Sequence, residues 1–166
     1  MSKDDISELI KKLDSTRFSE QETYWEEIKK LNIDIPKYFL EAYPTFKKWQ
    51  GRLHLVFSCI KYARTSESAF QLGIKALSDN ATLVRYRAAS VLAYSLRKDA
   101  IPYLRENLNH HDNESQKDAE RAIKAIMNQN HHIFMQDRAD TWIVNPETDE
   151  KRQIGIFDRI KKIIKK

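Results

Sequence analysis

The chain has 166 residues, of which 41% are hydrophobic and 32% are charged, and its formal net charge is +5. This length can bury a core within one domain, whereas 3 glycines and 4 prolines are too few for the many turns of a β-sandwich. The single cysteine, Cys59, excludes an internal disulfide. No apolar run approaches the ~18 residues of a membrane span, and the amino-terminal stretch MSKDDISELIKKL has no signal-peptide apolar core. We therefore expect one domain, residues 1–166, in the cytoplasm.

Apolar residues recur at helical spacing along residues 2–129. Ser19 followed by Glu22 predicts a capping box for the second helix, and the third helix is expected between Pro36 and Pro44. In chain order, the pattern predicts helices over residues 2–14, about 19–31, 36–43, 46–64, 67–78, 81–97, 99–109 and 115–129. Residues 1–45 are expected to form amino-terminal helices and residues 46–130 to form helix pairs.

The helical period stops within residues 131–166. The stretch TWIV followed by NPETD predicts a short strand and a turn. The final stretch, residues 155–166 (GIFDRIKKIIKK), predicts a basic amphipathic helix, with Ile156, Phe157, Ile160, Ile163 and Ile164 on one face. We expect this helix to cover the exposed apolar side of the last helix pair. The alternative is that it binds a membrane surface or another partner.

The helical region contains an internal repeat of 31 to 33 residues. The recurring positions are Ala69, Phe70 and Leu77 with Ala100, Ile101 and Leu108; Asp79, Ala89 and Leu92 with Asp112, Ala122 and Ala125; and Arg52 and Cys59 with Arg85 and Leu92. Each unit is a helix pair whose second helix carries small residues, which allow close packing. One such pair cannot bury its own apolar face, so the pairs are expected to stack.

The stretch LSDNATLVRYRAASVL, followed by DAIPYLRENL, resembles the HEAT-repeat pattern, and it is closest to the short HEAT-like repeats of bacterial proteins. The matching residues are Asp79, Val84, Arg85, Ala88, Leu92, Ala100, Ile101, Pro102, Leu104 and Leu108, and the match covers about residues 66–128. The resemblance implies an all-α protein. Its architecture would be a right-handed α-α superhelix, a HEAT-like solenoid, with a small non-repeating C-terminal segment.

The same resemblance implies that a turn aspartate and a following arginine hydrogen-bond along the stack, which makes Asp79 and Arg85 a structural ladder pair. Asp118 stands where the next arginine would be, so the ladder is expected to end there. HEAT-like families include binding scaffolds, adaptors, immunity proteins, bilin lyases and alkylpurine DNA glycosylases. The fold alone therefore does not decide the function.

The positive charge is concentrated in one block. Residues 44–105 contain 11 Lys and Arg against 3 Asp and Glu, whereas residues 106–150 contain 4 against 10. Residues 1–43 carry a net charge of −3 and residues 151–166 carry +6. A basic block of this kind indicates a partner with acidic or phosphate groups.

The candidate binding residues lie on two successive second helices. On residues 81–97, Val84, Ala88, Val91, Leu92 and Ser95 are expected to face the core, with Arg87, Ser90, Tyr94 and Arg97 on the opposite side. One repeat earlier, the corresponding residues are His54, Phe57, Lys61 and Arg64. The resemblance implies that second helices line a concave face. We expect His54, Lys61, Arg64, Arg87, Tyr94 and Arg97 to bind an acidic protein there.

This expectation makes the protein a non-enzymatic binding scaffold, with a bacterial immunity or adaptor role by analogy. The alternatives are a solvated charged face without a partner, or a DNA-binding or glycosylase-like repair protein. No metal or cofactor is expected, because the adjacent histidines His110–His111 and His131–His132 lack other ligands at metal-binding spacing. Cys59 lies in an apolar stretch and is expected to be buried.

Overall fold

The structure is a computed structural model that describes residues 2–135, 142–144 and 151–153. Residues 2–135 form helices and turns throughout, so the prediction of an all-α class is confirmed for this part of the chain. The helices are α1 (Lys3–Lys11), α2 (Phe18–Ile28), α3 (Ile35–Ala42), α4 (Trp49–Ser58), α5 (Glu67–Ala76), α6 (Thr82–Ser95), α7 (Ile101–Asn107), α8 (Asn113–Met127) and α9 (His132–Met135). Short 3-10 turns cover Tyr43–Thr45, Ile60–Tyr62 and Lys98–Ala100.

Two short strands follow the helices. β1 (Trp142–Val144) confirms the strand predicted at TWIV, and it pairs antiparallel with β2 (Lys151–Gln153), so that Ile143 lies opposite Arg152. The basic helix predicted over residues 155–166 lies outside the described residues.

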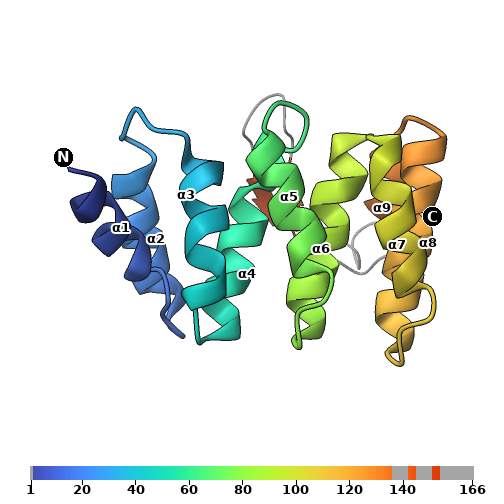
Figure 1. Cartoon of the computed structure of the whole chain (residues 1–166), viewed down its shortest axis with the longest axis horizontal. Coiled ribbons are helices and arrows are strands. Elements are labelled where there is room, and N and C mark those ends of the chain that lie inside the picture. Colours follow the sequence, from blue (N-terminus) through green and yellow to red (C-terminus); the bar gives the residue numbers. More distant parts are fainter. Residues whose placement is uncertain (1, 136–141, 145–150, 154–166) are drawn as a thin grey trace, which may run out of the picture.

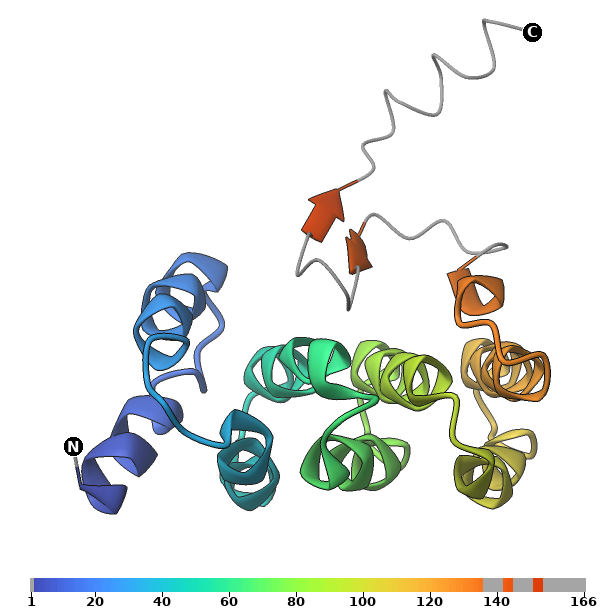
Figure 2. The ribbon, with the colours of Figure 1, turned by 90° about the horizontal axis from the view of Figure 1, so that it is seen from above.

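The helices form two layers. Figure 1 shows the helices from the side, and Figure 2 shows them nearly end-on, so that the two layers are separated. The first layer contains α1, α3, α5 and α7. The second layer contains α2, α4, α6 and α8, and contacts run both between the layers and along each one. On the side of the second layer that faces away from the first, α2 and α9 stand out at the two ends (Figure 2). We call this side the second-layer face.

Helix α6 occupies the centre of the stack and packs against α4, α5 and α8. Every residue from Val84 to Ser95 is buried, so the expectation of an outward stripe at Arg87, Ser90 and Tyr94 is wrong. The expected periodicity fails because α6 has neighbours on all its sides, including α9 residues over Tyr86. A helix that is buried all round needs no apolar stripe.

Among the described helices, four begin with a side-chain cap that satisfies backbone N–H groups of the first turn. Ser2 forms a capping box with Asp5, and the side chains of Asp34, Ser66 and Asp112 cap α3, α5 and α8. The capping box predicted at Ser19 is wrong, because α2 already begins at Phe18 and has no side-chain cap.

Large side chains of the core come from all parts of the described helices. Fully buried examples are Trp25, Phe39, Leu55, Phe70, Tyr86, Leu92 and Phe134. Leu108, which the repeat relates to the buried Leu77, is 38% exposed, because α7 ends at Asn107 and the chain turns away there. None of the helices that the structure describes is long and apolar enough to cross a membrane.

Candidate functional site

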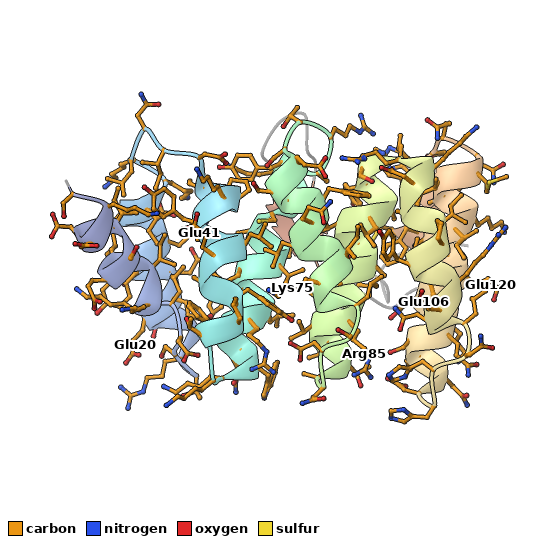
Figure 3. All side chains as sticks on the ribbon, in the orientation of Figure 1. Glu20, Glu41, Lys75, Arg85, Glu106 and Glu120 are labelled. Atoms are coloured by element: carbon orange, nitrogen blue, oxygen red, sulfur yellow. The ribbon has the colours of Figure 1, made fainter. Side chains whose placement is uncertain are left out.

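Two arginine–aspartate contacts tie neighbouring helix pairs together. Arg52 donates from Nε and Nη2 to the Asp79 carboxylate, at 2.6 and 3.0 Å. Arg85 donates from Nη2 to Asp112 Oδ2 at 2.5 Å. Both contacts join residues 27 positions apart, from the second helix of one pair to the turn of the next. Figure 3 places Arg85 near the beginning of α6.

The expected ladder pair Asp79–Arg85 therefore needs a correction. Arg85 does contact Asp79, but through Nη1 and the backbone carbonyl oxygen, at 2.6 Å. The Asp79 carboxylate is held by Arg52 and by the hydroxyl of Tyr43 at 2.5 Å. The physical reason is reach: a side chain on α6 turns toward α8, so it meets the carboxylate that follows in the stack.

Both ladder carboxylates are stabilised in their ionised form. Burial alone would raise their pKa values, but hydrogen bonds to the charged form outweigh it. For Asp79 these come chiefly from Arg52 and Tyr43, and for Asp112 from Arg85 and Thr82. The pKa of each aspartate is consequently below its usual value.

The ladder changes at Asp118, which stands 33 residues after Arg85. Its carboxylate is buried, and Arg121 Nη1 donates to Oδ1 at 3.2 Å. The arginine–aspartate pattern thus gives way to a contact within α8 itself.

Arg97 does not belong to the second-layer face. Its guanidinium forms ion pairs with Glu67 and Asp99 and lies 3.5 Å from the ring centroid of Phe70. Glu67 and Phe70 belong to α5, in the first layer. This arginine links α5 to the end of α6, and its positive charge is neutralised locally.

Arg87 lies between two aromatic rings. Its guanidinium carbon is 4.7 Å from the centroids of both Phe57 and Tyr86. Tyr86 in turn stacks on Phe134 with ring centroids 5.7 Å apart. Cation–π contacts of this kind hold an arginine in one orientation. Arg87 is only 9% exposed, so its charge is preorganised and largely removed from solvent.

A second cation–aromatic group lies toward α2. Lys61 Nζ is 4.9 Å from the ring centroid of Tyr62 and 6.0 Å from that of Trp25. His54 is buried and packs edge-on against Trp25, with centroids 5.8 Å apart. His54 therefore contributes to the core rather than to an exposed surface.

A third group joins α6 to the turn before α9. Arg64 donates from Nε to the backbone carbonyl of Tyr94 at 3.2 Å. Its Nη2 lies 2.8 Å from His131 Nδ1, which must accept because a guanidinium only donates. The His131 ring also packs on Tyr94, with centroids 4.5 Å apart. Burial raises the pKa of Tyr94, so its phenol stays neutral at physiological pH.

These three groups involve residues on or next to the second-layer helices, and we call them together the cation–aromatic row. Its cations are Lys61, Arg64 and Arg87, and its rings are Trp25, Phe57, Tyr62, Tyr86, Tyr94 and His131. The structure thus brings four of the six predicted binding residues into this row, namely Lys61, Arg64, Arg87 and Tyr94. His54 lies in the core, and Arg97 pairs with Glu67 and Asp99. Of the six rings, the predicted list included Tyr94 alone. Among the other five, only Phe57 was indicated by the sequence, because the repeat places it beside His54, Lys61 and Arg64.

The remaining reactive groups have structural surroundings. His110 stacks on His111, and His110 Nδ1 accepts from the backbone N–H of Asp112. Within the described residues, no cluster of three or more His, Cys, Asp or Glu side chains could hold a metal ion. Cys59 is fully buried, and this burial raises the pKa of its thiol.

No protein-family model matches the chain, and a search of curated proteins found no significant relative.

Proposed function

We propose that the protein is a non-enzymatic binding scaffold built from HEAT-like helix pairs, and that its second-layer face binds an acidic segment of another protein. The superhelical architecture is supported by the two layers and by the arginine–aspartate contact that recurs at the same 27-residue separation. An immunity or adaptor role in a bacterial cell fits a scaffold of this size.

The observation that carries the proposal is the cation–aromatic row. Aromatic rings fix the guanidinium of Arg87, and Arg64 is fixed by Tyr94 and His131. Preorganised guanidinium groups lose less conformational entropy when they bind a carboxylate. Aromatic and arginine side chains are also the residues that most often dominate protein interfaces.

The aspartates of the basic block, residues 44–105, favour a binding scaffold over a DNA glycosylase. Such an enzyme would need a carboxylate free to act on a substrate, and Asp79 and Asp99 are the two aspartates between residues 44 and 105. Asp79 is engaged by Arg52 and Tyr43, and Asp99 by Arg97. Both have structural roles in the described part of the chain.

The test is affinity capture from the native host, followed by calorimetry with each purified binder. The variant K61Q/R87Q removes two charges from the cation–aromatic row. The matched control K75Q/R105Q removes two exposed charges from the first layer, where Figure 3 shows Lys75 on α5. We expect the first variant to lose at least about tenfold in affinity and the control to lose less than about twofold. Equal affinities for both variants would remove this face from the proposal.

DNA binding is the second candidate, because of the +8 charge of residues 44–105. Retention on duplex DNA distinguishes the two candidates. A nucleic-acid role requires affinity that falls steeply with salt and falls further in K61Q/R87Q. Absence of retention at low salt would leave the protein-binding role.

A further inference from the structure

Helices α2 and α4 each begin with an exposed cation followed by an exposed ring. At α2 these residues are Arg17 and Phe18, and at α4 they are Lys48 and Trp49. Phe18 is 60% exposed and Trp49 is 40% exposed. A cation is unfavourable at the start of a helix because of the helix dipole, and neither start has a side-chain cap. Helix stability therefore does not account for these four residues.

One carboxylate holds the two helix starts together. Asp14, in the turn before α2, accepts from the backbone N–H groups of Lys47 and Lys48 at 3.0 and 2.9 Å. Gly51 in the first turn of α4 permits this approach, since a Cβ atom there would lie 2.9 Å from the Asp14 Cα atom. The exposed side chains of the two starts therefore lie on one ordered surface. We call it the α2–α4 edge patch, and its residues are Arg17, Phe18, Lys47, Lys48 and Trp49.

The apolar part of this edge continues to α6. The turns that lead into α2, α4 and α6 all lie along the lower edge of the molecule in Figure 1. Leu83, in the first turn of α6, is 46% exposed, so three successive second-layer helices each begin with an exposed large apolar side chain. Single exposed apolar residues are ordinary on a protein surface, but a row of them beside cations indicates an interaction site.

We propose that the α2–α4 edge patch binds the surface of a membrane that contains anionic phospholipids. Tryptophan, phenylalanine and leucine enter the interfacial region of a bilayer, while lysine and arginine are attracted to anionic headgroups. Arg17 forms an exposed ion pair with Glu20 at 3.1 Å, which contributes little, so a headgroup can replace the glutamate. The aliphatic Leu83 favours a bilayer over single-stranded nucleic acid, because only aromatic rings stack on bases. None of these residues belongs to the cation–aromatic row, so this proposal does not rest on the proposed function.

The test is co-sedimentation of the full-length chain with vesicles of phosphatidylcholine alone and of phosphatidylcholine mixed equally with phosphatidylserine. We expect the chain to bind the mixed vesicles at least about tenfold more tightly than the neutral ones. F18S/W49S should lose at least about fivefold in affinity for the mixed vesicles. Its matched control is Y103S/M127S, which removes two exposed apolar side chains from α7 and α8 and should lose less than about twofold.

A second pair of variants tests the charges. K47Q/K48Q should lose at least about fivefold in affinity for the mixed vesicles, whereas K75Q/R105Q, which removes two exposed charges from the first layer, should lose less than about twofold. The basic residues 155–166 are present in every variant, so any binding through them is the same on both sides of each comparison.

Fluorescence locates the contact at α4. In a W142F background the remaining tryptophans are Trp25, which is buried, and Trp49. Brominated phosphatidylcholine in the mixed vesicles should quench the emission of this variant, and W49F/W142F should show at least about twofold less quenching.

The proposal is overturned if the chain binds mixed vesicles no better than neutral ones, or if either edge variant binds as well as its control. Equal quenching with and without Trp49 overturns it as well. It is also overturned if the chain binds single-stranded DNA through the α2–α4 edge patch but binds no vesicles, since the partner would then be a nucleic acid.

Discussion

Arg85 Nη2 lies 2.5 Å from Asp112 Oδ2, and this contact ties α6 to the turn in front of α8. Asp112 also caps α8 through the backbone N–H of Glu114 and accepts from Thr82 and Ser115. The Asp112 carboxylate thus accepts hydrogen bonds from the first turn of α8, from two hydroxyl groups and from a buried guanidinium. We therefore expect the packing of α6 against α8 to depend on Asp112.

Replacing Asp112 by alanine should therefore destabilise the protein strongly. D112A leaves the nearly buried Arg85 without its carboxylate and removes the α8 cap, and we expect a loss of about 3–5 kcal/mol in the free energy of unfolding. D99A is the matched control, because the Asp99–Arg97 pair is exposed and should contribute less than about 1 kcal/mol. Urea unfolding followed by circular dichroism measures both. Similar losses for the two variants would contradict the ladder role of Asp112.

Acid should weaken the protein through the same carboxylates. The pKa values of Asp79 and Asp112 are lowered in the folded state, so the unfolded chain, with aspartate pKa values near ~3.9, takes up protons first. The stability from these groups is complete above about pH 5 and is lost as the pH falls below ~4 toward the folded values. D112N should flatten the pH dependence by up to about 1.4 kcal/mol per pH unit in that range. Parallel curves for wild type and D112N between pH 2.5 and 7 would count against this linkage.

Gly73 lies where α5 packs closely against α6. A Cβ atom there would lie 3.0 Å from Leu92 Cδ2 and 3.1 Å from Val91 Cγ1, tighter than ordinary contact. Alanine gains about 1 kcal/mol of helix propensity over glycine, but overpacking against α6 should cost about 1–3 kcal/mol. We expect G73A to be destabilised by thermal unfolding, whereas K75A on the exposed side of α5 should change stability by less than about 0.5 kcal/mol. A more stable G73A would show that the two helices can separate freely.

The helices could be predicted because apolar spacing is a property of each helix by itself. The 33-residue repeat then relates one helix pair to the next. It also relates Arg52 to Arg85 and Asp79 to Asp112, since each pair occupies equivalent positions in the repeat. Which aspartate carboxylate each arginine contacts could not be predicted from the sequence. A contact across 6 residues and one across 27 are equally compatible with the repeat, and only the packing of α6 on α8 selects the longer one for the carboxylate.

The cation–aromatic row was predicted less completely. Trp25 and His131 reach it from opposite ends of the described helices, so no spacing rule connects them. The chain returns to α6 through Gln129, which has a left-handed backbone with φ of 50°. Glycine is the residue most common in this left-handed conformation. Because the position holds a glutamine instead, the sequence does not indicate the turn that brings Phe134 onto Tyr86.

Because the chain returns to α6 at this turn, Phe134 tests whether α9 holds the second-layer face in place. Its ring is fully buried and stacks on Tyr86 at 5.7 Å, and it is the only buried residue of α9. F134A should lose about 3–4 kcal/mol of stability, by the cavity it leaves and the lost ring contact. Because Tyr86 also flanks Arg87, amide hydrogen exchange should accelerate in α9 and around Arg87 but not in α1 or α3. M127A is the control: Met127 is 61% exposed on α8 and its loss should leave both stability and exchange nearly unchanged. If F134A accelerates exchange no more than M127A does, α9 does not hold the second-layer face in place.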